Sequence, residues 1–163
     1  TTFEVYLPRA TEARPERVEV KVGAVGGQET ILVVEDEMLL RRLASRILTH
    51  GGYLVLTAAG GEQALEVAQE HGERIDLLLT DVVMPGMHGD EIAEELTSAR
   101  PGLRVLFMSG YADEVLVERR TLVEETCFIQ KPFTAPQLLA KIREALDRDD
   151  LPPAEESAPE AAE

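Results

Sequence analysis

The chain has 163 residues, and its 31 Asp and Glu against 16 Lys and Arg give a formal net charge of −15. This balance excludes nucleic acid as the main partner, because binding phosphate requires concentrated Lys and Arg. The single cysteine, Cys127, excludes a disulfide scaffold. No apolar run approaches the ~20 residues that span a bilayer. We therefore expect no direct membrane contact and a cytoplasmic location, although a parent protein could itself be attached to a membrane.

Charge and composition divide the chain into three parts. Residues 147–163 hold seven acids, one base and three prolines, which predicts a solvated, disordered tail over 148–163. Residues 1–29 alternate apolar and polar side chains at 3–7 and 18–22, which predicts a linker with a tendency to form strands. The part between them, residues 30–147, is the candidate domain.

This candidate domain alternates short apolar runs with helical patterns. Apolar runs typical of buried strands lie at 31–34, 53–57, 75–80, 104–108 and 127–130. Apolar residues at helical spacing predict helices at 37–50, 61–71, 89–99 and 113–125, and a last helix that Thr134 caps and that reaches Leu146. Apolar strands that alternate with amphipathic helices predict an α/β fold with a parallel sheet covered on both faces.

Polar side chains follow the predicted strands. Glu35 and Asp36 come after the first strand and Asp81 after the third, whereas Ser109 and Lys131 come after the fourth and fifth. In an open α/β sheet, ligands bind outside the carboxyl ends of the strands. We therefore expect three carboxylates, one hydroxyl and one ammonium group to converge at one edge of the sheet.

Such a cluster has a clear chemical use. Neighbouring carboxylates repel each other unless a cation joins them, and Mg²⁺ suits a site with few protein carboxylates and a substrate phosphate. An Asp beside the ion can attack phosphorus and form an aspartyl phosphate. Each residue alone also has a simpler explanation: Asp36 could cap a helix, Ser109 could begin a turn and Lys131 could pair with a surface acid.

Four segments of the chain resemble the receiver domain of two-component response regulators. They are Ile-Leu-Val-Val-Glu-Asp-Glu at 31–37, Thr-Asp-Val-Val-Met-Pro-Gly-Met-His-Gly at 80–89, Met-Ser-Gly-Tyr at 108–111 and Lys-Pro-Phe at 131–133. Their order and spacing match the family over residues 30–147. The resemblance implies a flavodoxin-like (βα)₅ fold with strand order 2-1-3-4-5.

The resemblance also implies a set of metal ligands. Asp36, Asp81 and the backbone carbonyl of Val83 would bind Mg²⁺, and Glu35 would assist through a water molecule. Asp81 would accept a phosphoryl group from the phosphohistidine of a kinase, in cis or in trans.

Further residues would respond to this phosphorylation. Lys131 and Ser109 would bind the phosphoryl oxygens, and movement of Ser109 would let Phe128 turn inward as a switch. The alternative is that Phe128 is simply a core residue of the fifth strand. The domain would catalyse its own phosphorylation and slow dephosphorylation without being a turnover enzyme.

The partners implied are a histidine kinase and a downstream histidine phosphotransfer protein. The kinase is expected to dock on the helix at 37–50, near Met38, Leu39 and Arg42. The segment Thr-Thr-Phe-Glu-Val-Tyr-Leu-Pro at 1–8 resembles the last strand of the ATP-binding domain of sensor histidine kinases. It favours a hybrid histidine kinase with a C-terminal receiver over a stand-alone single-domain regulator.

Three other classes agree less well with the sequence. A Mg²⁺-dependent aspartyl-phosphate phosphatase of the haloacid-dehalogenase type requires a second Asp where this chain has Val83. A nucleotide-binding Rossmann domain requires a Gly-rich turn where 35–37 are all acidic. A non-phosphorylated docking module would be expected to lack Asp81 or Lys131.

Overall fold

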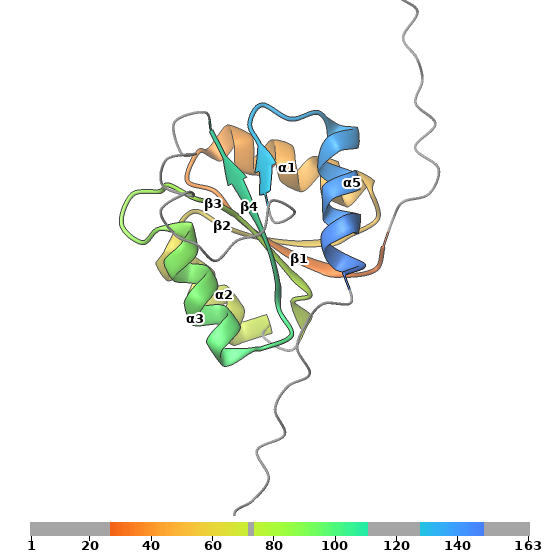
Figure 1. Cartoon of the computed structure of the whole chain (residues 1–163). Helices are drawn as coiled ribbons and strands as arrows, with labels where there is room; N and C mark the ends of the chain where they lie inside the picture. The colour runs from red at the N-terminus through yellow and green to blue at the C-terminus, as the bar shows by residue number, and fades with distance from the viewer. Residues whose placement is uncertain (1–26, 72–73, 111–127, 149–163) are drawn as a thin grey trace, which may run out of the picture.

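The computed structural model describes residues 27–71, 74–110 and 128–148 (Figure 1). The elements in chain order are β1 Thr30–Val34, α1 Met38–His50, β2 Leu54–Ala58, α2 Gly61–His71, β3 Leu77–Asp81, α3 Gly89–Ala99, β4 Arg104–Ser109, β5 Phe128–Gln130 and α5 Ala135–Leu146. The strands predicted at 3–7 and 18–22, the helix predicted at 113–125 and most of the predicted tail lie outside the described residues.

The described strands form one parallel sheet in the order β2-β1-β3-β4-β5. This order confirms the α/β fold predicted from the alternation of strands and helices. It also places β1 directly beside β3, with Val34 opposite Thr80, so the residues that follow these two strands become neighbours. Among the described residues, no helix combines the length and the apolar character needed to cross a bilayer.

Helices cover both faces of the sheet. In Figure 1, α1 and α5 lie on one side and α2 and α3 on the other. Alternate residues of β1 face opposite sides: Ile31 and Val33 belong to one core cluster, and Leu32 and Val34 belong to the other. Successive side chains of a strand point to opposite faces. A strand that is buried on both sides must therefore be apolar throughout, as the run at 31–34 is.

The last helix follows the prediction closely. Thr134 and Gln137 form a reciprocal capping box at its start, and Pro136 lies in its first turn. Its apolar stripe packs onto the face of the sheet that α1 also covers. Each large apolar side chain buried in this way stabilises the fold by about 1.5–3 kcal/mol. The buried residues of the stripe are Leu138, Leu139, Ile142, Ala145 and Leu146.

Several predicted boundaries are wrong by one or two residues. Helix α1 begins at Met38 instead of residue 37, and β2 begins at Leu54 instead of Tyr53. The backbone N–H of Tyr53 donates to the carbonyl of Leu48 at the end of α1, so it is used by the helix and not by the sheet. Strand β3 begins at Leu77, and the preceding Ile75 is buried in the core without belonging to a strand.

A close contact between α3 and β3 requires glycine. A Cβ atom at Gly89 would lie 1.9 Å from the carbonyl oxygen of Asp81, which no side chain permits. Helix α3 can therefore start directly against the end of β3 only because Gly89 has no side chain. Gly86, in the loop between them, has φ +84°, a conformation that also favours glycine. These two glycines fix the loop that follows Asp81.

Candidate functional site

The polar residues predicted to converge lie at one edge of the sheet. Glu35 follows the last residue of β1, Asp81 ends β3, Ser109 ends β4 and Lys131 follows β5. The backbone N–H of Lys131 donates to the Ser109 carbonyl at 2.7 Å, which ties the start of the loop after β5 to the end of β4. Because all strands are parallel, their carboxyl ends meet at the same edge.

Lys131 joins two of the acids directly. Its Nζ lies 2.7 Å from Oε2 of Glu35 and 2.7 Å from Oδ2 of Asp81. Only 2% of the Glu35 side chain and 12% of the Asp81 side chain are exposed. Both carboxylates have therefore lost much of their contact with water, and one shared ammonium group replaces part of that solvation.

Burial and pairing act on the pKa values in opposite directions. Burial raises the pKa of Glu35, and the hydrogen bond from Lys131 lowers it without fully compensating, so the net shift is upward. For Lys131, burial lowers the pKa, but the hydrogen bonds to Asp81 and Glu35 outweigh it and the net shift is again upward. The ammonium form of Lys131 is thus strongly favoured at neutral pH.

Asp36 completes an acidic cluster. Carboxylate oxygens of Glu35, Asp36 and Asp81 all lie within 4.8 Å of one another. Three carboxylates against one ammonium group leave an excess of negative charge. Oxygen ligands at this spacing fit Mg²⁺, which binds through few carboxylates and keeps several waters. The donor set present at this edge therefore suits the metal that the sequence predicted.

Other predicted residues lie around this cluster. Asp36 is exposed and does not cap α1, because the N-cap residue is Glu37, which itself makes no side-chain cap hydrogen bond. Val83 lies in the loop after β3 and is 39% exposed. The ring of Phe128 stacks on Phe107 with a centroid separation of 5.4 Å. Phe128 is thus partly buried against the α2–α3 side of the core.

Four hydrogen bonds at the site were not predicted from the sequence. The Arg41 guanidinium donates to the backbone carbonyls of Glu35 and Asp36, and the N–H of Glu35 donates to the Ala58 carbonyl. The Thr80 hydroxyl donates to the Asp81 carbonyl at 3.0 Å. These partners carry no sequence signal, because an arginine on a helix or an alanine ending a strand is common in any α/β domain.

The raised pKa of Glu35 predicts a measurable effect on stability. Folding favours the protonated form, so the stability that Glu35 contributes is lost as the pH rises through its raised folded-state pKa. In EDTA at neutral pH, Glu35→Gln should therefore raise the free energy of unfolding by about 1 kcal/mol. This advantage should vanish below the ordinary glutamate pKa of about 4.3.

Urea denaturation at several pH values measures this effect. Glu37→Gln is the matched control, because Glu37 is exposed and its substitution should not raise the free energy of unfolding at neutral pH. A Glu35→Gln protein less stable than the wild type at neutral pH would contradict the prediction.

Comparison with known proteins identifies the family. The response regulator receiver domain model matches residues 31–143. The sensor kinase CckA of Brucella abortus is 36% identical over 160 residues, which cover 92% of this chain but only 17% of that protein. The receiver protein CpdR of the same organism is 35% identical, over 71% of this chain and 95% of its own length.

A solved structure agrees with this comparison. The receiver domain of the hybrid histidine kinase CckA superposes with a TM-score of 0.59 at 35% identity, covering 72% of this chain and 98% of that one. The two chains therefore share one fold over the covered residues. The chain therefore belongs to the response regulator receiver domain family.

Proposed function

We propose that Asp81 is the phosphoacceptor of this receiver domain. A carboxylate oxygen of Asp81 attacks the phosphorus of a kinase phosphohistidine, the new P–O bond forms, and the P–N bond breaks with its electron pair returning to the imidazole. The observation that carries this proposal is the short bridge from Lys131 to both Asp81 and Glu35, beside Asp36. It supports the proposal because an ammonium group and two further carboxylates surround one nearly buried carboxylate.

Lys131 and Ser109 are proposed to hold the transferred group. The ammonium of Lys131 is already 2.7 Å from Asp81, so a small shift lets it contact a phosphoryl oxygen. The Ser109 hydroxyl, at the end of the neighbouring strand β4, would donate to another. Both interactions are charge-assisted hydrogen bonds to an anion, which are stronger than neutral ones.

Mg²⁺ is proposed to bind to Asp36, Asp81 and the Val83 carbonyl. When bound, it would neutralise negative charge on the phosphoryl oxygens. Glu35 is proposed to act through a water molecule. Its Oε2 accepts from Lys131 and its Oε1 accepts from the Glu37 backbone N–H at 3.3 Å. Since both oxygens of Glu35 already have partners, a direct bond from Glu35 to the metal is less favourable than one from Asp36.

Phosphorylation is proposed to change the conformation through Ser109 and Phe128. A phosphoryl group adds a concentrated negative charge, which would draw the Ser109 hydroxyl toward it. Ser109 pairs with Gln130 across β4 and β5, two residues along from the pair of Phe107 and Phe128. A shift of Ser109 would therefore also displace the stacked rings of Phe107 and Phe128.

Two parent architectures are compatible with this chemistry, and we favour the hybrid histidine kinase. The match to sensor kinase CckA covers 92% of the chain. Residues 27–163 make up less than 92% of the 163 residues. The match must therefore include part of the first 26 residues. A stand-alone, cytoplasmic regulator is the alternative, because the chain also covers 95% of CpdR and 94% of sporulation initiation phosphotransferase F of Bacillus subtilis.

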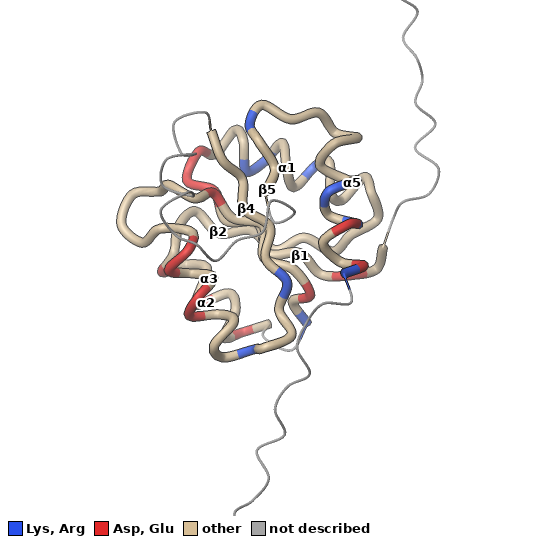
Figure 2. Tube along the Cα trace, viewed as in Figure 1, with Lys and Arg blue, Asp and Glu red and all other residues tan. Residues whose placement is uncertain are grey.

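The kinase is proposed to dock on α1, near Met38, Leu39 and Arg42. Met38 is 50% exposed, Leu39 69% and Leu43 48%, so α1 presents an apolar strip next to the acidic cluster. Figure 2 shows basic residues along α1 and acidic residues along α2 and α3. A partner helix with apolar side chains and acidic flanks would complement α1 better than it would complement the opposite side.

The phosphoacceptor is tested by substitution of Asp81. Asp81→Asn removes the nucleophilic oxygen with little change in volume, so labelling by acetyl phosphate in Mg²⁺ should fall to background. Phosphate-affinity electrophoresis measures the labelled fraction. Asp90→Asn, at the start of α3, is the control and should label like the wild type.

A second substitution at the site tests the metal. Asp36→Ala should remove the dependence of labelling on Mg²⁺ by removing a ligand.

Stoichiometric labelling of Asp81→Asn would overturn the proposed phosphoacceptor, whatever the behaviour of Asp36→Ala.

The docking surface is tested with a matched pair of exposed leucines. Leu39→Glu should slow phosphoryl transfer from a phosphorylated histidine kinase about tenfold, the effect of about 1.4 kcal/mol at an interface. Labelling by acetyl phosphate should be unchanged, because it needs no docking. Leu54→Glu, on β2 and 62% exposed, should transfer like the wild type. Equal slowing by both substitutions would exclude α1 as the specific contact.

The parent architecture is tested by the coding sequence immediately upstream of Thr1. A hybrid kinase predicts an ATP-binding domain encoded there in frame, ending in the segment at 1–8. A start codon without such a domain would instead establish the stand-alone regulator.

A further inference from the structure

The loop between β1 and α1 is weakly held by its own residues. It consists of residues 35–37 and carries two of the three acids of the cluster. The N-cap residue Glu37 makes no side-chain cap hydrogen bond, and the first turn of α1 has no acidic residue. Helix starts are ordinarily fixed by such contacts. Glu35 is held separately, because its backbone N–H donates to the Ala58 carbonyl and its carboxylate accepts from Lys131, so Asp36 is the acid whose position needs a further contact.

Arg41, in the first turn of α1, supplies that contact. Its Nη1 donates to the carbonyl oxygen of Glu35 and, at 3.2 Å, to that of Asp36. A guanidinium group is planar and always charged, so it can bind two adjacent carbonyls in a fixed geometry. The contact joins α1 to the backbone of the acidic pair, Glu35 and Asp36, and not to their carboxylates.

Asp36 depends on this contact more than Glu35 does. The Glu35 carboxylate is separately anchored by Lys131 and by the Glu37 N–H. In the part of the chain that the structure describes, the Asp36 carboxylate has no hydrogen bond, and the bond from Arg41 to its carbonyl is the one that constrains it. The direction of the Asp36 side chain is thus set through its backbone.

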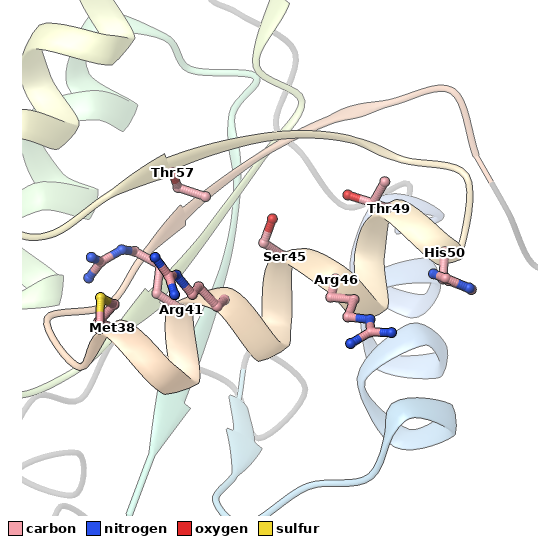
Figure 3. A pocket seen from close by; sticks show the side chains of 8 residues that line it. Met38, Arg41, Ser45, Arg46, Thr49, His50 and Thr57 are labelled. Carbon is pink, nitrogen blue, oxygen red and sulfur yellow. The ribbon is translucent and has the colours of Figure 1, made fainter.

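Arg41 differs in this respect from its neighbours on the helix. Arg41, Arg42 and Arg46 all line a groove of about 470 Å³ along α1, which Thr57 of β2 borders. Figure 3 shows Arg41 beside Met38 near the start of α1 and Arg46 farther along the helix. Among the described residues, Arg41 is the one arginine of this groove that donates to the loop.

We propose that Arg41 is a positioning residue that aims Asp36 at the metal site through the backbone of the loop. The proposal rests on the Mg²⁺-dependent function proposed above. Electrostatics alone predicts the opposite effect, because removing a positive charge near three carboxylates should tighten the binding of a cation. The sign of the change in Mg²⁺ affinity therefore separates positioning from simple charge repulsion.

The test is a Mg²⁺ titration of Arg41→Met, followed by NMR because the chain has no Trp. Met keeps the helix propensity of Arg but cannot donate to the carbonyls. We expect the dissociation constant for Mg²⁺ to rise about tenfold, the lower end of the effect of losing a group that orients a metal ligand. Arg46→Met removes the same charge from the same groove and should leave the constant unchanged or slightly lower.

A kinetic measurement distinguishes positioning from general damage. With acetyl phosphate, Arg41→Met should require more Mg²⁺ for half-maximal labelling but reach the wild-type rate within about twofold at saturating Mg²⁺. A fall in the maximal rate with an unchanged Mg²⁺ requirement would overturn the proposal. So would Mg²⁺ binding by Arg41→Met as tight as that of the wild type or of Arg46→Met.

A second variant keeps the test decisive if Arg41→Met does not fold. Arg41→Lys retains the charge and can reach one carbonyl, so it should raise the Mg²⁺ dissociation constant about threefold, against no change for Arg46→Lys. Equal constants for these two lysine variants would overturn the proposal. If the wild type binds Mg²⁺ but takes no label from acetyl phosphate, the proposed function fails while the titration still decides the role of Arg41.

Discussion

Repulsion among three carboxylates is the constraint on which this site depends. Glu35, Asp36 and Asp81 are brought together because β1 and β3 are neighbours in the sheet. Lys131 offsets part of that repulsion. It directly follows β5, which lies two strands beyond β3 in the sheet order. One ammonium group does not neutralise three acids, and the remaining negative charge suits the binding of a divalent cation. We propose that such a cation is what would let a negatively charged phosphoryl group approach this edge of the sheet.

The rest of the domain holds this unfavourable arrangement in place. Two apolar clusters fix the sheet from both sides, and their free energy offsets the cost of the buried acids. Gly89 lets α3 close directly over the end of β3, so the Asp81 backbone is held by packing. A site built at the ends of rigid strands keeps its geometry better than one built on long loops.

Helix α1 connects the acidic cluster to the surface. Its first turn contacts the loop of the acidic pair through Arg41, and the same helix exposes Met38 and Leu39. A partner that binds this strip would therefore lie next to the loop that carries Asp36. The proposed docking surface and the loop that carries Asp36 would then both depend on the position of α1.

The order of the described strands and helices, and the polar residues that follow the strands, could be predicted from the sequence. The bounds of α3 at 89–99 were predicted without error, because apolar spacing follows the helical period and Gly89 marks the start. The acids and Lys131 were identified from their places after apolar runs. Only the packing of the elements shows that Lys131 contacts both Glu35 and Asp81. The same is true of the bond from the Tyr53 N–H to the Leu48 carbonyl and of the bonds from Arg41 to the carbonyls of Glu35 and Asp36. The physical reason is that periodicity reports which face a residue takes within its own element, whereas a hydrogen bond depends on how separate elements pack.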